Sequence, residues 1–409
     1  MRKLLGILPI SLVLLGGCGG GGGGGSSGGG GGGTPQACTA VSMTAAQQLQ
    51  NPVTLFAANN NGVIVELPTV PPAGAASASG SLVFGIANTD LTGNTQLEGH
   101  ADSGAISATL NGMTYSSFLD SGSNANFFPD TSLTVCKDNA NFYCSNANES
   151  ATLQGQNNLT LPAPFAVADA DTLFQVNFTA YNNLGGPNPT NAANPTASVD
   201  LGLSFFYGRN ILIGFETLSG SPAPFFAYGA PQTIATPGPP NVEPLKVDAG
   251  PAALPAIATN TPFVNISICQ PGTSTCQTID HIEVDTGSVG LRLISSVLTS
   301  VKLPLTTNGG QPYAECLQFA DGTSWGSLAT ADIKFPVSGK TASNVAVHLI
   351  GDPSVGGPPA GCTGTTENTV GTFGANGILG VGPFATDCSN GTCPATSTGA
   401  TYYSCPVTH

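Results

Sequence analysis

Apolar residues recur along this chain in short, strand-like runs, and no long stretch keeps the spacing of an amphipathic helix. One run, 281–285 (HIEVD), is followed directly by the turn-forming residues 286–288. The 55 glycines and 32 prolines fit many short strands joined by turns. We therefore predict a mainly β protein. Its 409 residues suffice for two ordinary domains or one large bilobal one.

Two strand-rich segments are separated by a proline-rich stretch. The first segment covers residues 38–230 and the second covers residues 263–409. Residues 231–262 between them show no regular pattern, so we predict a linker there. Two lobes joined by a linker is the expected organisation.

Residues 1–18 have the features of a targeting segment. Arg2 and Lys3 precede an apolar run, 4–15, that is too short to span a membrane. The run ends in the sequence LGGC, which resembles a bacterial lipobox and implies cleavage before Cys18 and lipidation of that residue. The next residue is Gly19 rather than Asp, so the resemblance implies the outer membrane if the cell is Gram-negative. A plain secretory signal with a chance cysteine is the alternative, and residues 19–37 form a Gly/Ser-rich tether in either case.

The charge balance restricts the partners that we expect. The chain has 23 acidic and 9 basic residues, a net charge of −14, which disfavours nucleic acid and anionic lipid surfaces. Membrane contact is therefore expected through the lipid anchor only. Four scattered histidines and the absence of zinc-type CxxC spacing argue against a metal, and we expect no cofactor. Ten cysteines besides Cys18, in an exported chain, indicate disulfides.

A short acidic motif occurs once in each segment. Residues 118–123 (FLDSGS) and 284–288 (VDTGS) both place an apolar residue before Asp, then a hydroxyl residue, Gly and Ser. Each copy has an apolar-Gly element well downstream: 376–382 (NGILGVG) after the second copy and 199–216 (VDLGLSFFYGRNILIGFE) after the first. The triplet at Asp102 (HADSG) lacks both flanking features and is interpreted as a turn.

Two facing aspartates can hydrolyse amides. Two carboxyl groups about 3 Å apart cannot both ionise, so they share a proton. One then activates a water molecule while the other polarises a carbonyl group. We expect Asp120 and Asp285 to be catalytic, and the following residues to shape their loops: Ser121, Gly122, Ser123, Thr286, Gly287 and Ser288.

The paired motifs resemble those of pepsin-like aspartic peptidases. The resemblance implies a bilobal fold of two β-barrel-type lobes, with one aspartate from each lobe in the cleft between them. It implies a flap hairpin near 322–335 (GTSWGSLATADIKF), where Phe319 stands nearest to the family's flap tyrosine and Trp325 offers an indole N–H. The lobe with the flap and the GILG element comes second here, so the order resembles a circular permutation of the family.

A closer resemblance is to an uncharacterised family of proteobacterial lipoproteins with phrases such as CQTIDHIEVDTGSVGLRLI, NNLGGP and FFYGRN. In that family the DTGS lobe comes first, so Cys405 and Cys38 would be close neighbours along the chain. The permutation thus implies a Cys38–Cys405 disulfide, with Cα atoms within about 7 Å. The other cysteines are expected to form four pairs: Cys136–Cys144, Cys269–Cys276, Cys388–Cys393 and Cys316–Cys362.

Three other interpretations stay open at this point. Asp120 and Asp285 could belong to ordinary Asp-Gly turns, or the fold could serve a non-catalytic periplasmic or surface lipoprotein that binds a peptide or protein. Residues 322–326 also match the GxSxG pattern of serine hydrolases, with Asp332 and His348 as nominal partners of Ser324. The expected function is an aspartic endopeptidase held in the cell envelope, and its oligomeric state is not indicated.

Overall fold

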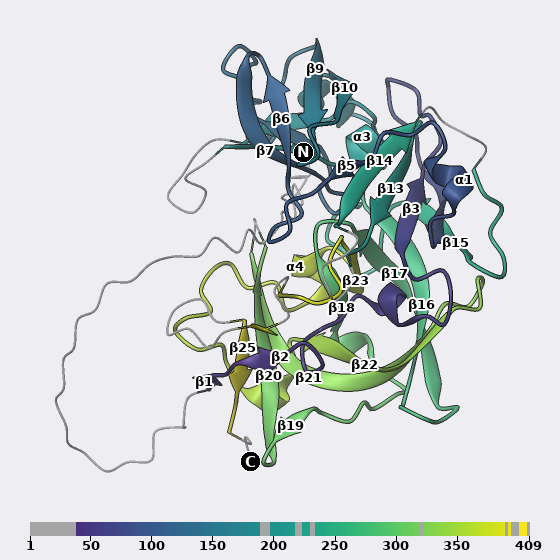
Figure 1. The fold of residues 1–409 in the computed structure, drawn as a ribbon. Helices are drawn as coiled ribbons and strands as arrows, with labels where there is room; N and C mark the ends of the chain where they lie inside the picture. The colour runs from purple at the N-terminus through teal and green to yellow at the C-terminus, as the bar shows by residue number, and fades with distance from the viewer. Residues whose placement is uncertain are drawn as a thin grey trace, which may run out of the picture.

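The computed structural model describes residues 38–188, 197–216, 223–229, 234–319, 322–388, 392–393 and 401–406. Strands dominate these residues, and the helices are single turns (Figure 1). Across these ranges no helix is long and apolar enough to cross a membrane. The predicted signal segment, Cys18 and the tether lie outside the described residues. The mainly β prediction is confirmed.

The second lobe contains a closed six-stranded barrel. The strands follow the order β16-β17-β23-β18-β22-β21, and β21 pairs back to β16. Alternate residues fill the interior, such as Ile266, Ile268, Val345 and Val347, all with 0% exposure. The barrel strands are β16 (Pro262–Cys269), β17 (Cys276–Asp285), β18 (Val289–Ile294), β21 (Thr323–Lys334), β22 (Thr341–Ile350) and β23 (Gly377–Val381).

The first lobe is built on a separate seven-stranded sheet, at the top of Figure 1. Its strand order is β10-β9-β6-β7-β12-β8-β11. The bounds are β6 (Ile106–Leu110), β7 (Met113–Leu119), β8 (Asn126–Phe128), β9 (Ala147–Gln154), β10 (Thr160–Val167), β11 (Gly185–Pro187) and β12 (Ser198–Leu201). Within the part of the chain that the structure describes, this sheet does not close on itself, since β10 and β11 are its edges.

Both lobes contain the same four-strand arrangement. In the first lobe β7 is parallel to β12, β12 is antiparallel to β8, and β8 is parallel to β11. In the second lobe β17, β23, β18 and β22 repeat these three relationships in the same order. The repeated sequence motif is therefore a repeated fold, with the two aspartates at the ends of β7 and β17. This is the predicted bilobal, aspartic-peptidase-like fold.

The segment predicted as an irregular linker contains a strand, which corrects that prediction. Strand β15 (Val242–Val247) pairs with β16 on one side and β4 (Ala78–Phe84) on the other. Leu245 and Val247 are buried while Lys246 between them is exposed, but the surrounding prolines obscure this short alternation. Beyond β4 the sheet continues through β3 (Gly62–Glu66), β13 (Asn210–Gly214), β14 (Phe225–Gly229) and β5 (Leu97–Glu98).

The start of the described chain belongs to the second lobe, so the predicted boundary of the first lobe at residue 38 is wrong. Strand β1 (Thr39–Ala40) pairs with β25 (Tyr402–Ser404), which pairs with β20 (Gln311–Gln318), as Figure 1 shows. Strand β2 (Met43–Thr44) pairs with β24 (Thr392–Cys393). Met43 and Leu49 pack against Tyr402 and Leu328. Hydrophobic burial thus draws these residues to the second lobe.

The remaining elements are short. They are β19 (Thr307–Asn308), the helical turns α1 (Asn88–Leu91), α2 (Ala170–Leu173), α3 (Leu203–Phe206) and α4 (Val370–Phe373), and the 3-10 turns η1 (Pro52–Leu55), η2 (Ser295–Val297) and η3 (Pro353–Val355).

Five disulfides join the ten cysteines, in the five predicted pairs. The long-range pair Cys38–Cys405 has a Cα–Cα distance of 4.2 Å, which confirms that these residues are neighbours across a separation of 367 positions. Both ends of the described chain therefore meet in the second lobe.

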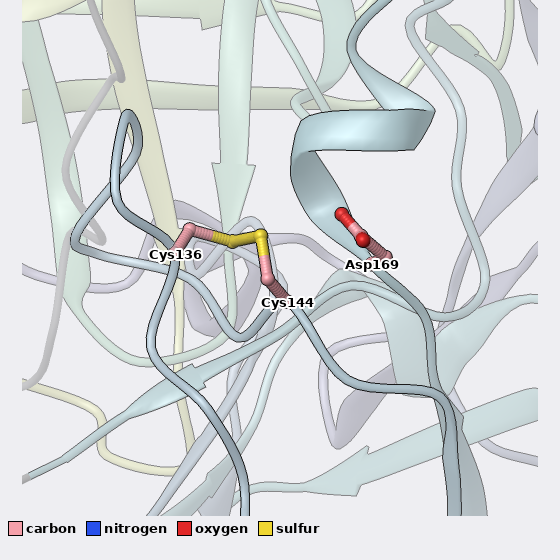
Figure 2. A group of neighbouring side chains, drawn as sticks. All are labelled: Cys136, Cys144 and Asp169. Carbon is pink, nitrogen blue, oxygen red and sulfur yellow. A yellow bond between two sulfur atoms is a disulfide. The ribbon is translucent and has the colours of Figure 1, made fainter.

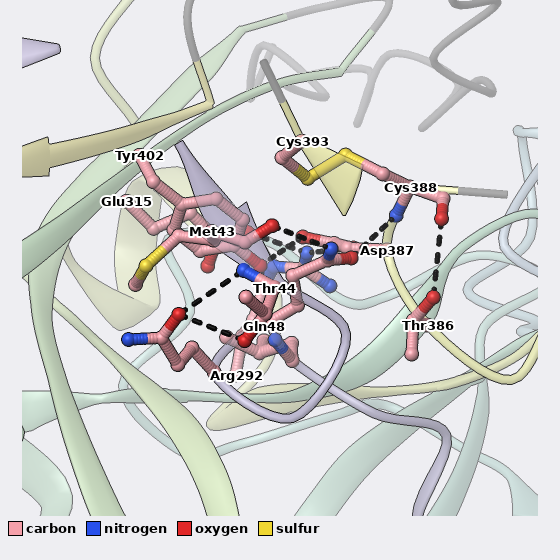
Figure 3. The surroundings of a disulfide bond; sticks show 12 residues. Met43, Thr44, Gln48, Arg292, Glu315, Thr386, Asp387, Cys388, Cys393 and Tyr402 are labelled. Atoms are coloured by element: carbon pink, nitrogen blue, oxygen red, sulfur yellow. Dashed lines mark hydrogen bonds and ion pairs between the residues drawn. A yellow bond between two sulfur atoms is a disulfide. The ribbon is translucent and has the colours of Figure 1, made fainter. Parts of the chain in front are cut away.

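A buried ion cluster holds the same region together (Figure 3). Arg292 on β18 is fully buried, and its guanidinium donates to Glu315 at 2.7 Å and to Asp387 at 2.9 Å. The hydroxyl of Tyr402 donates to Asp387 and accepts from the backbone N–H of Leu49. Because both chain ends contribute to this cluster, it ties them to the strand that leaves the second Asp loop.

Replacing Cys38 and Cys405 together by Ser is expected to lower the free energy of unfolding by up to roughly 5 kcal/mol, because the closed loop is very long. The matched control, Cys136→Ser with Cys144→Ser, opens a loop with a separation of 8 and should cost roughly 2–3 kcal/mol. Urea unfolding of both variants measures the two losses. An equal or reversed order would contradict the closing role of the long-range disulfide.

Candidate active site

Asp120 and Asp285 stand where β7 and β17 end, each in a tight loop. The backbone N–H of Gly122 donates to Asp120 Oδ1 at 2.9 Å, and that of Gly287 donates to Asp285 Oδ1 at 2.7 Å. Each loop thus fixes its carboxyl group through a glycine two residues later. The exposed fractions of Asp120 and Asp285 are 0% and 2%, so the environment of both carboxyl groups is set by the protein.

The two loops are locked together by reciprocal hydrogen bonds. The N–H of Ser121 donates to Thr286 Oγ1 at 2.9 Å, and the N–H of Thr286 donates to Ser121 Oγ at 3.1 Å. The Ser121 hydroxyl donates to the carbonyl of Val284 at 2.6 Å, and the Thr286 hydroxyl donates to that of Leu119 at 2.8 Å. Since one partner in every bond comes from each lobe, the bonds hold both aspartates at the lobe junction.

Each carboxyl group lies against the glycine of the opposite loop. A Cβ atom on Gly122 would come within 2.7 Å of Asp285 Oδ1, and one on Gly287 within 2.7 Å of Asp120 Oδ1. No residue larger than Gly fits in either place without displacing a carboxyl group. These close approaches explain the glycine of each motif and show that the sequence repeat brings the aspartates face to face.

Burial and neighbouring carboxyl groups strongly perturb the protonation of Asp120. Burial raises the pKa of Asp120 well above its usual range, and the negative charges of Asp285 and then Asp200 raise it further. The N–H of Gly122, which donates to Asp120 Oδ1, lowers this pKa. Asp120 therefore keeps its proton to higher pH than an exposed aspartate does.

The downstream apolar-Gly elements pack beside the strands that carry the two loops. Strand pairing sets Leu119 beside Leu201 in the first lobe and Asp285 beside Gly380 in the second. A Cβ atom on Gly202 would lie 2.1 Å from a backbone oxygen of Ala125, and one on Gly380 would lie 2.5 Å from the nitrogen of Val289. Both glycines allow close backbone contact under the aspartates.

A third acidic residue, which was not predicted from the sequence, lies at this site. Asp200 on β12 is 1% exposed, and its Oδ2 lies 2.6 Å from Ser123 Oγ, which also lies 3.0 Å from Asp120 Oδ2. Among the described residues, the corresponding hydroxyl of Ser288 has no hydrogen-bond partner. The sequence did contain a signal for Asp200. It is an aspartate within an otherwise apolar element (VDLGL), and the second element has Ile378 at the matching position.

Neither flap candidate has the predicted role. Strands β20 and β21 do form a hairpin, paired from Ala314–Ser327 to Gln318–Thr323. However, the indole N–H of Trp325 already donates to the carbonyl of Gly356, and its ring packs on Tyr403. The Phe319 ring packs on Phe373 and is 9% exposed. Both side chains are core residues because the register turns them toward apolar clusters.

The serine-hydrolase interpretation is contradicted by the structure. Ser324 is a buried residue within β21, so it does not stand on the strand-to-helix turn that a nucleophile elbow requires. His348, its nominal partner, lies 2.9 Å from Glu315 in the buried ion cluster. The GxSxG match therefore arises from a glycine-rich strand.

One group of metal-type donors occurs among the described residues: Cys136, Cys144 and Asp169, with donor atoms within 4.8 Å of one another. Figure 2 shows that the two sulfur atoms are joined in a disulfide. Sulfur in a disulfide does not act as a thiolate ligand, so the disulfide accounts for this group.

The chain belongs to a family described as "Protein of unknown function (DUF3443)", whose model matches residues 32–228 and 237–409. No curated protein matches the chain significantly. Among solved structures it is similar to an aspartic proteinase from Irpex lacteus, with 12% identity and a TM-score of 0.31. That similarity covers 76% of this chain and 97% of the proteinase.

Thr286→Val is expected to lower the free energy of unfolding by about 2–4 kcal/mol, because the N–H of Ser121 and the carbonyl of Leu119 lose their buried partner. Thr278→Val is the matched control: its hydroxyl pairs with Ser267 on an exposed face, and its loss should cost less than about 1 kcal/mol. Denaturant unfolding measures both. Equal losses would contradict the coupling of the two loops.

Proposed function

We propose that this protein is an aspartic endopeptidase that hydrolyses peptide bonds with Asp120, Asp285 and a water molecule. One observation carries the proposal: the reciprocal Ser121 and Thr286 hydrogen bonds set two buried carboxyl groups side by side, one from each lobe. The raised pKa of Asp120, caused first by burial and then by the negative charge of Asp285, supports the same function.

The proposed reaction needs one proton on the dyad. The ionised carboxylate takes a proton from water, whose oxygen attacks the carbonyl carbon, while the protonated carboxyl group gives its proton to the carbonyl oxygen. The resulting diol collapses as the amide nitrogen receives a proton from the former base and the C–N bond breaks. A diol hydroxyl returns its proton to the former acid. The dyad ends in its starting state, and no cofactor takes part.

The alternative function is a non-catalytic lipoprotein that binds a peptide or protein. The observation in its favour is the burial of the dyad, with exposed fractions of 0% and 2%, because a substrate must gain access to both carboxyl groups. The two functions differ in outcome: a peptide library is cleaved by the first and only bound by the second. In either case we propose attachment to the outer membrane through lipid on Cys18.

Protein lacking residues 1–33 is expected to cleave denatured protein near about pH 4, because one carboxyl group of the dyad stays protonated at acidic pH. A statine-type inhibitor is expected to block this cleavage. Asp120→Asn and Asp285→Asn should each remove nearly all activity, because the pair acts as a unit. Asp102→Asn is the control, since it alters the same Asp-Ser-Gly triplet at an exposed position. Cleavage that survives either dyad substitution would sink the assignment.

Asp120→Asn is also expected to change how stability depends on pH. Below the unfolded pKa of about 3.9, Asp120 is protonated in both states. As pH rises toward the raised folded pKa, the unfolded chain releases this proton and the folded protein retains it, so folding stability falls. Asparagine cannot titrate and removes this loss.

The variant should therefore gain stability relative to the wild type as pH rises above about 4, by on the order of 1.4 kcal/mol for each pH unit by which the folded pKa exceeds the unfolded one. Urea unfolding across this range measures the difference. A difference that stays constant with pH would show that Asp120 carries no raised pKa in the folded protein.

A further inference from the structure

The two aspartates differ in what lies behind them. Pairing of β12 with β7 sets Leu201 beside Leu119, and pairing of β23 with β17 sets Leu379 beside Val284. One position earlier on β12 and β23, Asp200 in the first lobe corresponds to Ile378 in the second, and both side chains are buried. The fold therefore places a third carboxyl group behind Asp120 and an aliphatic side chain at the matching position behind Asp285.

Ser123 connects this third carboxyl group to the dyad. Its Oγ lies 2.6 Å from Asp200 Oδ2 and 3.0 Å from Asp120 Oδ2. A hydroxyl has one proton to donate, so it can serve only one carboxylate in full. For both contacts to be hydrogen bonds, the second carboxyl group must itself carry a proton and donate it to Oγ. The bridge thus requires a proton on either Asp120 or Asp200.

The lengths of the two contacts indicate where that proton resides. Hydroxyl-to-carboxylate bonds are short, about 2.5–2.7 Å, and bonds between neutral groups are longer. The 2.6 Å contact fits an ionised Asp200 that accepts from Ser123, and the 3.0 Å contact fits a protonated Asp120. The negative charges of Asp285, on the opposite loop, and of Asp200, on β12, both favour protonation of Asp120.

We propose that Asp200 is a positioning residue that acts through Ser123 to hold the dyad's proton on Asp120, leaving Asp285 as the base. The assignment of acid and base rests on the proposed peptidase function, whereas the location of the proton does not. In the reaction Asp120 gives its proton to the carbonyl oxygen, Asp285 takes a proton from water, and Asp200 stays ionised throughout. The dyad is thereby asymmetric before any substrate binds.

The test measures which carboxyl group carries the proton in the protein without substrate. Infrared difference spectra across a pH titration follow the C=O stretch of protonated carboxyl groups, and the band that disappears in Asp120→Asn belongs to Asp120. In Asp200→Asn, which keeps the size of the side chain and removes its charge, the midpoint of this band should fall by about one pH unit or more. An unchanged midpoint, or spectra of Asp120→Asn in which no wild-type band of a protonated carboxyl group is lost, would overturn the proposal.

Ser123→Ala supplies a second variant in case Asp200→Asn does not fold. It removes the hydroxyl that accepts from Asp120 and keeps both carboxyl groups, so the Asp120 midpoint should again move to lower pH. An unchanged midpoint in this variant would contradict transmission through Ser123.

The pH profile of peptide cleavage gives a separate readout. In Asp200→Asn the alkaline limb of kcat/KM should move to lower pH by the same amount as the infrared midpoint, and in the control Asp102→Asn it should not move. A uniform loss of kcat/KM at every pH would assign Asp200 a purely structural role. If the wild type cleaves no peptide, the proposed function fails, and the infrared titration still decides where the proton lies.

Discussion

The reciprocal hydrogen bonds between Ser121 and Thr286 are the interaction on which the rest of this structure depends. They join residues 165 positions apart, and they are the contacts that fix two acidic loops from different lobes against each other. Burying a carboxyl group costs free energy of folding, and holding two like charges in contact costs more. The protein tolerates this arrangement because both loops are also fixed by their own glycine N–H groups and by close packing from below.

The path of the chain brings both of its described ends to the same lobe. The disulfide Cys38–Cys405, the pairing of β1 with β25, and the buried cluster around Arg292 all connect residues near position 40 to residues near position 400. The strand β18 that carries Arg292 leaves the loop of Asp285 directly. The closure of the chain and the placement of one dyad aspartate are therefore parts of one packed unit.

Sequence alone predicted the features that repeat or that follow strict geometry. The two Asp-x-Gly-Ser motifs revealed the duplicated lobes, because the same strand arrangement needs the same turn and the same downstream glycine. The Cys38–Cys405 pair was implied by the resemblance to a family with permuted order, and the other pairs followed mainly from proximity along the chain. Strand β15 was not predicted because the surrounding prolines obscure the alternation of Leu245 and Val247. The boundary of the first lobe was misplaced because burial of Met43 depends on a partner at the other end of the chain.

Side-chain direction within the site was harder to predict than the position of the site. Trp325 was expected to offer its N–H to a substrate, but which face of a hairpin is buried depends on register, and here the N–H is used by Gly356. Asp200 was missed because a lone aspartate in an apolar run gives no sign of a partner such as Ser123. Both cases require tertiary contacts that no local pattern encodes.

The most direct test of the central claim is a crystal structure of the protein at acidic pH with a statine-type inhibitor bound. We expect the inhibitor's hydroxyl group to lie between Asp120 and Asp285, within about 3 Å of both carboxyl groups, in the place of the attacking water. An inhibitor bound elsewhere, or carboxyl groups too far apart to contact one hydroxyl, would contradict it.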